Sequence, residues 1–206
     1  MTDFESSLRR ILEFAVGTEE TAADDLIKRY RNHQALAVAE YDELEKMPSV
    51  GGDAAMLIRL AYFLAARAET DKFRLGAVCT EDAILNYLRA LFYCSPNETV
   101  YALLLDDRGR VTFSHFVSEG TVNASAVLPR RVLELAVKGS ARSVILAHNH
   151  PLGYATPSIE DVETTHILKR MLESTGRELL AHYVIASDGK AEFGKVLVRQ
   201  KHHNTS

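Results

Sequence analysis

The sequence predicts an α/β protein in which helices fill the first third and strands alternate with helices afterwards. Two observations indicate this order. Up to about residue 68, apolar residues recur at helical spacing. From residue 98 onward, short apolar runs of strand length alternate with longer amphipathic segments. We therefore expect a small helical domain over residues 1–72 and a mixed β-sheet core flanked by helices over residues 73–206.

Composition and charge exclude several classes of protein. The chain has 206 residues, of which 47% are apolar and 25% charged, as in a globular protein that buries its core without disulfides. Its net charge is −4, and the first 75 residues hold 10 Lys and Arg against 14 Asp and Glu, so no global basic field favours nucleic acid. Cys79 and Cys94 do not form a C-x-x-C pair. With no signal-like N-terminus and no bilayer-long apolar run, we expect a cytoplasmic protein without membrane contact.

The sequence of the first third predicts a series of helices. Residues Phe4–Val16 place apolar side chains on one face of a helix, and a second helix is expected from about Glu19 to Tyr30. Short helical pieces follow through Leu44, and an apolar helix runs to about Ala68. The polar stretch Glu69–Leu75 is the predicted domain boundary.

The remaining two thirds mix strands and helices. A nearly continuous apolar run over residues 100–105 fits a strand covered on both faces, and the turn at Asp107–Gly109 predicts an antiparallel hairpin with the next strand. Pro129 fits the first turn of a helix, and Gly139 lies past its end. The expected helices are Thr80–Tyr93, Leu128–Val137 and Ser158–Ser174, and the expected strands are Glu98–Asp106, Arg110–Ser118, Ser143–Ala147, His182–Ala186 and Phe193–Val198.

Two histidines lie at the end of a predicted strand, and two further polar residues open the helix that follows. Alternate residues of a strand point to the same side, so His148 and His150 can aim at one point if the strand continues. Pro151 disfavours a helical conformation at His150. Ser158 and Asp161 are three residues apart at a helix start and share one face. The sequence thus predicts that two imidazoles and a carboxylate meet.

Two histidines and one aspartate suit a catalytic zinc ion, which leaves a fourth position for water. Taken singly, each part has an ordinary interpretation: Ser158 and Asp161 can simply cap the helix, and His148 and His150 can be hydrogen-bonded polar residues. The full pattern H-x-H-P-x6-S-x2-D is expected by chance about once in 10^5 chains of this length. Capping and metal chemistry are also compatible at Ser158.

This pattern resembles the JAMM (JAB/MPN) metalloprotease motif, and more narrowly its bacterial RadC branch. The resemblance rests on His148-Asn149-His150-Pro151, Thr156-Pro157-Ser158 and Glu160-Asp161. It extends to Gly120–Ser125 and Leu179–Ile185, and covers roughly residues 76–200. It implies a JAB/MPN-type mixed sheet and a zinc-dependent metallopeptidase that hydrolyses an amide or isopeptide bond in a protein or peptide, including a conjugate of a ubiquitin-like protein.

The resemblance also implies a role for each site residue. His148, His150 and Asp161 would bind Zn²⁺, Glu98 would act as general base and then general acid, and Ser158 would stabilise the oxyanion. Spacing alone does not select Glu98, and its ordinary interpretation is an exposed residue at a strand start. Of the other histidines, His182 is a candidate to contact a metal ligand, and His166 is expected to be a packing or surface residue.

Two departures from the family pattern and one further motif leave alternatives open. Leu152 stands where RadC proteins often have serine, and Ala181 replaces a usual aspartate, which would remove a carboxylate partner of a ligand. Leu44–Ala55 looks like a helix-hairpin-helix, a motif that can bind phosphate, but Asp53 and the acidic surroundings oppose this. The alternatives are a non-catalytic DNA-associated RadC-like factor and an inactive scaffold. The sequence specifies neither substrate nor oligomeric state.

Overall fold

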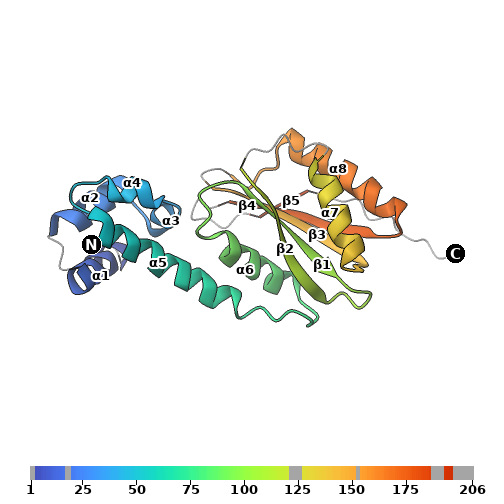
Figure 1. Ribbon diagram of the computed structural model, residues 1–206, viewed down its shortest axis with the longest axis horizontal. Helices are drawn as coiled ribbons and strands as arrows, with labels where there is room; N and C mark the ends of the chain where they lie inside the picture. Colours follow the sequence, from blue (N-terminus) through green and yellow to red (C-terminus); the bar gives the residue numbers. More distant parts are fainter. Residues whose placement is uncertain (1–2, 17–19, 121–126, 152–153, 187–192, 197–206) are drawn as a thin grey trace.

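The computed structural model describes residues 3–16, 20–120, 127–151, 154–186 and 193–196. It has the mixed α/β character that the sequence predicts (Figure 1). The helices are α1 (Asp3–Val16), α2 (Glu20–Tyr30), α3 (His33–Ala37), α4 (Tyr41–Glu45), α5 (Gly51–Thr70), α6 (Glu81–Phe92), α7 (Val127–Lys138) and α8 (Ile159–Ser174). The strands are β1 (Thr99–Leu105), β2 (Val111–Glu119), β3 (Ser143–His150), β4 (Glu178–Ala186) and β5 (Phe193–Val196).

The strands form one mixed sheet in the order β2-β1-β3-β4-β5. β1 is antiparallel to both β2 and β3, β3 is parallel to β4, and β5 is antiparallel to β4. The parallel pair requires a crossover, and α8 provides it. β3 therefore lies in the middle of the sheet, and seven of its eight residues are buried, in keeping with the apolar run that begins it.

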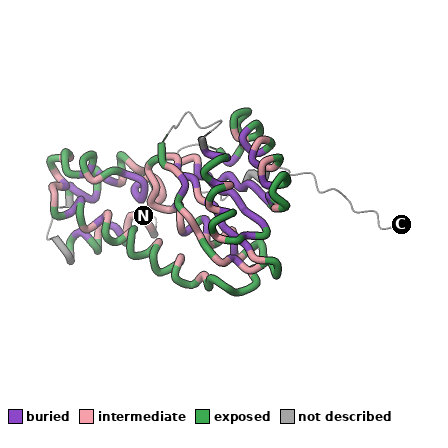
Figure 2. Tube along the Cα trace, turned by 45° about the vertical axis from the view of Figure 1, so that its right-hand side comes forward, coloured by how far each residue is buried: buried purple, intermediate pink, exposed green. Residues whose placement is uncertain are grey.

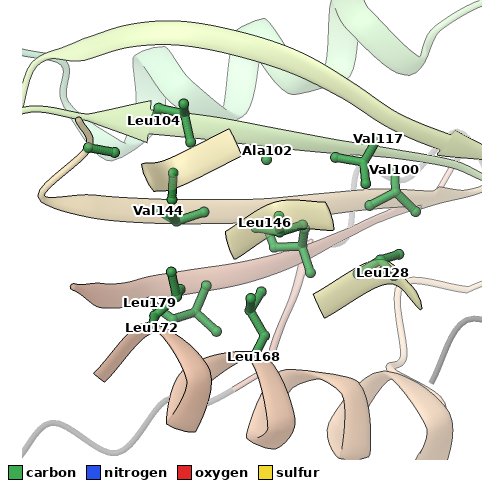
Figure 3. Close-up of a cluster of buried hydrophobic side chains, with 13 residues drawn as sticks. Val100, Ala102, Leu104, Val117, Leu128, Val144, Leu146, Leu168, Leu172 and Leu179 are labelled. Atoms are coloured by element: carbon green, nitrogen blue, oxygen red, sulfur yellow. The ribbon is translucent and has the colours of Figure 1, made fainter. Parts of the chain in front are cut away.

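Helices cover both faces of the sheet, so that the strands are buried between two apolar clusters (Figure 1). Figure 3 shows Leu168 and Leu172 of α8 beneath Val144 and Leu146 of β3, within the cluster that α7 also joins. α6 covers the opposite face. Full burial of one leucine side chain contributes about 1.5–3 kcal/mol to folding. Because Val144 and Leu146 face α7 and α8, the alternation along β3 directs the next two even-numbered residues to that same face.

The first five helices pack around an apolar cluster of their own, which includes Leu26, Leu44 and Ile58. The Arg59 guanidinium of α5 ties this region together by donating to the carbonyl oxygens of Ala37, at 2.6 Å, and Ala39, at 2.9 Å. These helices follow the expected ranges closely. The division of the chain at residues 72 and 73, and the helix-hairpin-helix assignment, stay predictions.

Two strands extend beyond the ranges that the sequence predicts, and β1 is one residue shorter at each end. β3 runs on through His150, which keeps both histidines extended. β4 begins at Glu178 rather than at His182, because Leu179 joins the cluster under α7 and α8 and parallel pairing with Ser143 starts there. The helix end expected at Gly17 and the turn expected at residues 188–189 lie outside the described residues. None of the described helices combines the length and apolar character that a membrane-spanning segment requires.

Candidate metal centre

The end of β3 and the start of α8 bring three of the expected site residues together. Nitrogen atoms of His148 and His150 and a carboxylate oxygen of Asp161 all lie within 4.8 Å of one another. His148 Nε2 lies 3.1 Å from His150 Nε2 and 3.2 Å from Asp161 Oδ1, and His150 Nε2 lies 3.8 Å from Asp161 Oδ2. His148 is buried, whereas His150 and Asp161 are partly open to solvent. The group is therefore accessible to solvent at His150 and Asp161, while His148 is enclosed by the protein.

The helix cap at Ser158 orients the carboxylate of Asp161. Ser158 Oγ accepts from the Asp161 backbone N–H at 3.1 Å, and Asp161 Oδ2 accepts from both the backbone N–H and the hydroxyl of Ser158 at 2.7 Å. This is a capping box, which satisfies backbone donors that a helix start leaves free. The other carboxylate oxygen of Asp161, Oδ1, faces His148. The capping interpretation and the metal-site interpretation therefore hold together in one geometry.

Asp161 is held in its ionised form. Burial by itself raises the pKa of this carboxyl, but the adjacent His148 ring and the hydrogen bonds from Ser158 act in the opposite direction. The net result is a pKa well below the usual value for aspartate. The site therefore offers a full negative charge beside two imidazoles at neutral pH, which suits a cation.

Glu98 is not a member of this three-residue group. It is half-buried and immediately precedes β1, and its carbonyl oxygen accepts from the Gly120 backbone N–H at 2.7 Å. Val100 pairs with His148 in the antiparallel ladder, so two residues further the same register puts Glu98 opposite His150. Opposite residues of an antiparallel pair share one face of the sheet. Extended two residues beyond its last backbone pair, this register assigns Glu98 to the face that carries both histidines.

The side chain of Asn149 fastens the segment around Glu98 to the end of β3. Its Oδ1 accepts from the Thr99 backbone N–H at 2.7 Å, and its Nδ2 donates to the Asn97 carbonyl oxygen at 3.2 Å. Asn149 points to the opposite side of β3 from the two histidines and is 3% exposed. The amide thus extends the ladder between β1 and β3 beyond its last backbone pair. No spacing in the sequence indicates this role for Asn149.

A second set of hydrogen bonds involves Nδ1 of His148, the ring nitrogen that does not face Asp161. Its Nδ1 lies 2.9 Å from Nε2 of His182 on β4, and His182 Nδ1 lies 2.7 Å from the Thr165 hydroxyl on α8. His182 is fully enclosed, and burial, followed by the nearby charge of His148, lowers its pKa to about 3. His182 is therefore neutral. The expected contact of His182 with a ligand is present, whereas Thr165 was missed because nothing in its spacing distinguishes it from its neighbour Thr164.

The donor and acceptor roles at the two histidines fit a bound metal ion. His150 Nδ1 lies 2.8 Å from the Tyr154 carbonyl oxygen, which can only accept, so the ring proton is on Nδ1. A neutral His150 then has its lone pair on Nε2, which is the atom that faces His148 and Asp161. A metal ion binds imidazole nitrogen through such a lone pair and is attracted by the carboxylate. The side chains present therefore suit zinc.

His166 and Ala181 are not members of the His-His-Asp group. His166 is exposed on α8 and takes no part in the group. Ala181 belongs to the cluster on the α6 face of the sheet, away from His148. An aspartate at position 181 would point to that face, so its replacement by alanine removes no partner from the metal ligands. Leu152 lies outside the described residues.

The fold and this group of side chains together define an α/β protein with a His-His-Asp group that could hold a metal ion at the end of a central strand. Residues 78–195 match the family model of the RadC-like JAB domain. The chain belongs to this family, as the sequence resemblance indicated.

Relatives share most of their length with this chain. A UPF0758 protein of Cupriavidus necator is 34% identical over 165 residues, which cover 80% of this chain and 72% of the relative. A UPF0758 protein of Geobacter sulfurreducens is 34% identical over 170 residues, with 80% and 72% covered. A UPF0758 protein of Finegoldia magna is 31% identical over 186 residues, with 87% and 82% covered. The similarity therefore extends beyond the residues that the family model matches.

Proposed function

We propose that this chain is a zinc-dependent metallopeptidase that hydrolyses an amide or isopeptide bond in a protein or peptide substrate. The observation that supports this most is the convergence of two imidazole nitrogens and an ionised carboxylate at one accessible point. His148, His150 and Asp161 would hold the ion. Three protein ligands leave a position free, which is typical of catalytic rather than structural zinc sites.

Each remaining residue has a role that its position supports. When bound, zinc would polarise the scissile carbonyl and make a water molecule acidic. Glu98, on the same face of the sheet as the histidines, would take a proton from that water and deliver it to the departing amine. Ser158 Oγ would donate to the developing oxyanion. To do so, the hydroxyl must turn away from Asp161 Oδ2, while its oxygen still caps α8.

Metal analysis of the purified chain tests the binding step. We expect about one zinc per chain, and in excess zinc at 100 times Kd the free energy of unfolding rises by about 2.7 kcal/mol. His148→Ala and Asp161→Ala are expected to lose both the metal and this stabilisation. His166→Ala, an exposed histidine on α8, is the matched control and keeps them. If the wild-type chain takes up no zinc, the proposed function is wrong.

Cleavage assays test the chemical step. A panel of peptides and isopeptide-linked conjugates, followed by mass spectrometry, would report hydrolysis. Glu98→Gln is expected to keep zinc but to abolish cleavage, whereas Glu178→Gln, an exposed acid at the start of β4, is expected to behave as wild type. Ser158→Ala is expected to slow cleavage about 10²–10³-fold, as removal of an oxyanion donor does. Normal cleavage by Glu98→Gln would exclude this residue as the base.

The alternative, a non-catalytic factor that contacts DNA through the turn between α4 and α5, has less support. The Ser49 hydroxyl in that turn donates to the Asp25 carboxylate at 2.6 Å, and Asp53 lies in the first turn of α5. Both carboxylates would repel a phosphate.

A further inference from the structure

We propose that Thr165 and His182 are positioning residues that fix the ring proton of His148 on Nδ1, so that Nε2 is ready to bind a metal ion before the ion arrives. This inference rests on the proposed zinc site and assigns a role to residues outside the ligand set.

The direction of the hydrogen bonds follows from one carbonyl group. Thr165 Oγ lies 2.6 Å from the Asp161 backbone carbonyl oxygen, which can only accept. A hydroxyl has a single proton, so Thr165 donates it there and must accept from His182 Nδ1–H at 2.7 Å. His182 is buried between the Thr165 hydroxyl and the His148 ring, neither of which is a carboxylate that could offset a charge, so the ring is uncharged and has its lone pair on Nε2. That atom accepts from His148 Nδ1–H at 2.9 Å, which leaves the lone pair of His148 on Nε2.

Burial makes these directions hard to reverse. His148, Thr165 and His182 are each 2% exposed, so water cannot easily replace a lost partner. If the order were reversed, Thr165 would have to donate to His182, and the Asp161 carbonyl oxygen would lose that partner. His148 would then carry its proton on Nε2, only 3.1 Å from His150 and 3.2 Å from Asp161, and a metal ion would have to displace it.

The same hydrogen bonds link two of the three proposed metal ligands, Asp161 and His148. The series begins at the backbone of Asp161 and ends at His148, whose Nε2 faces the Asp161 carboxylate. It passes from α8 through β4 to β3, so the two elements that carry the proposed ligands are linked through β4 by buried hydrogen bonds. Partners that orient a ligand in this way commonly change metal affinity about 10–100-fold when they are removed.

The zinc affinities of two Thr165 variants test the proposal. Thr165→Val keeps the shape but removes the hydroxyl, and it is expected to bind zinc about 10–100-fold more weakly in competition with a chromophoric chelator. Thr165→Ser restores the hydroxyl and is expected to recover most of the affinity. Thr164→Val removes the neighbouring buried hydroxyl, which is outside these bonds, and serves as control. Equal affinity of Thr165→Val and wild type would overturn the proposal.

Two further measurements remain decisive if Thr165→Val does not fold. Nitrogen-15 NMR of the metal-free wild-type chain at pH 8 is expected to show His148 and His182 protonated on Nδ1, and a proton on His148 Nε2 would overturn the proposal. His182→Gln retains an acceptor for His148 and is expected to bind zinc more tightly than His182→Leu. If the wild-type chain binds no zinc but shows these tautomers, the proposed function fails while the fixed proton positions stand.

Discussion

The helical first third and the sheet core are both built on apolar clusters, but they differ in what else they bury. Figure 2 shows buried stretches of chain in both regions. Among the described residues, every polar residue that is buried as a whole belongs to the sheet core. These residues are Thr99, Ser143, His148, Asn149, Thr164, Thr165 and His182. Most of them meet at or beside the end of β3 through the hydrogen bonds described above. Burying a polar group is costly unless it is paired, so this concentration indicates where the fold serves chemistry rather than stability alone.

The helical region presents the opposite pattern. Its described interior is apolar, while large apolar side chains of α5 remain on the surface, among them Met56, Leu60 and Phe63. A helix that is apolar on several faces is usually covered on all of them. Buried polar side chains, rather than exposed apolar ones, therefore mark the candidate site of this chain.

The largest difference between the two regions is expected when one core leucine is removed from each of them. Leu44→Ala and Leu146→Ala each remove a fully buried side chain, and each is expected to destabilise its region by about 2–5 kcal/mol. Because Leu146 precedes His148 by two residues on β3, only Leu146→Ala is expected to weaken zinc binding. Calorimetry and zinc titration would measure both effects. Loss of zinc binding in Leu44→Ala would show that the two regions are one unit.

A substitution within the buried polar group has the next largest expected effect. Asn149→Leu leaves the buried Thr99 N–H without its acceptor, at a cost of about 1–3 kcal/mol, and removes one donor from the Asn97 carbonyl oxygen, which keeps the Thr99 hydroxyl at 3.1 Å. It is also expected to displace Glu98 and slow cleavage, while the metal ligands stay in place. Denaturant unfolding and zinc titration would separate these effects, with the exposed Asn86→Ala as control. Zinc binding that falls together with cleavage would contradict this role.

The smallest effect is expected from substitutions in the turn between α4 and α5, where the measured quantity is DNA affinity. Ser49→Ala and Lys46→Ala are expected to leave DNA affinity unchanged, because the acidic first third gives little affinity to lose. Fluorescence anisotropy with duplex DNA at increasing salt would measure this. Binding that is tight at low salt, falls steeply as salt rises and is lost in Lys46→Ala would revive the DNA-associated alternative.

Much of the fold could be predicted from the sequence because its signals are local. Apolar periodicity located the helices, and the spacing of His148, His150 and Asp161 predicted their convergence. Glu98 was selected by resemblance alone, since only the register between β1 and β3 brings it opposite His150. The roles of Asn149 and Thr165 depend on partners that the chain order does not reveal. The expected consequence of Ala181 was wrong for the same reason, because the pairing of β3 with β4 decides which face it occupies.

The position of β3 between β1 and β4 also has a consequence for folding. The bond from Thr99 to Asn149 joins residues 50 apart in the sequence, and the bond from His148 to His182 joins residues 34 apart. Contacts between distant residues form slowly, because the chain must first lose the entropy of the loops that they close. The metal centre is therefore complete only after both neighbours of β3 have paired with it. We expect zinc uptake to be a late event in folding, slower than the appearance of helical signal from α1 to α5.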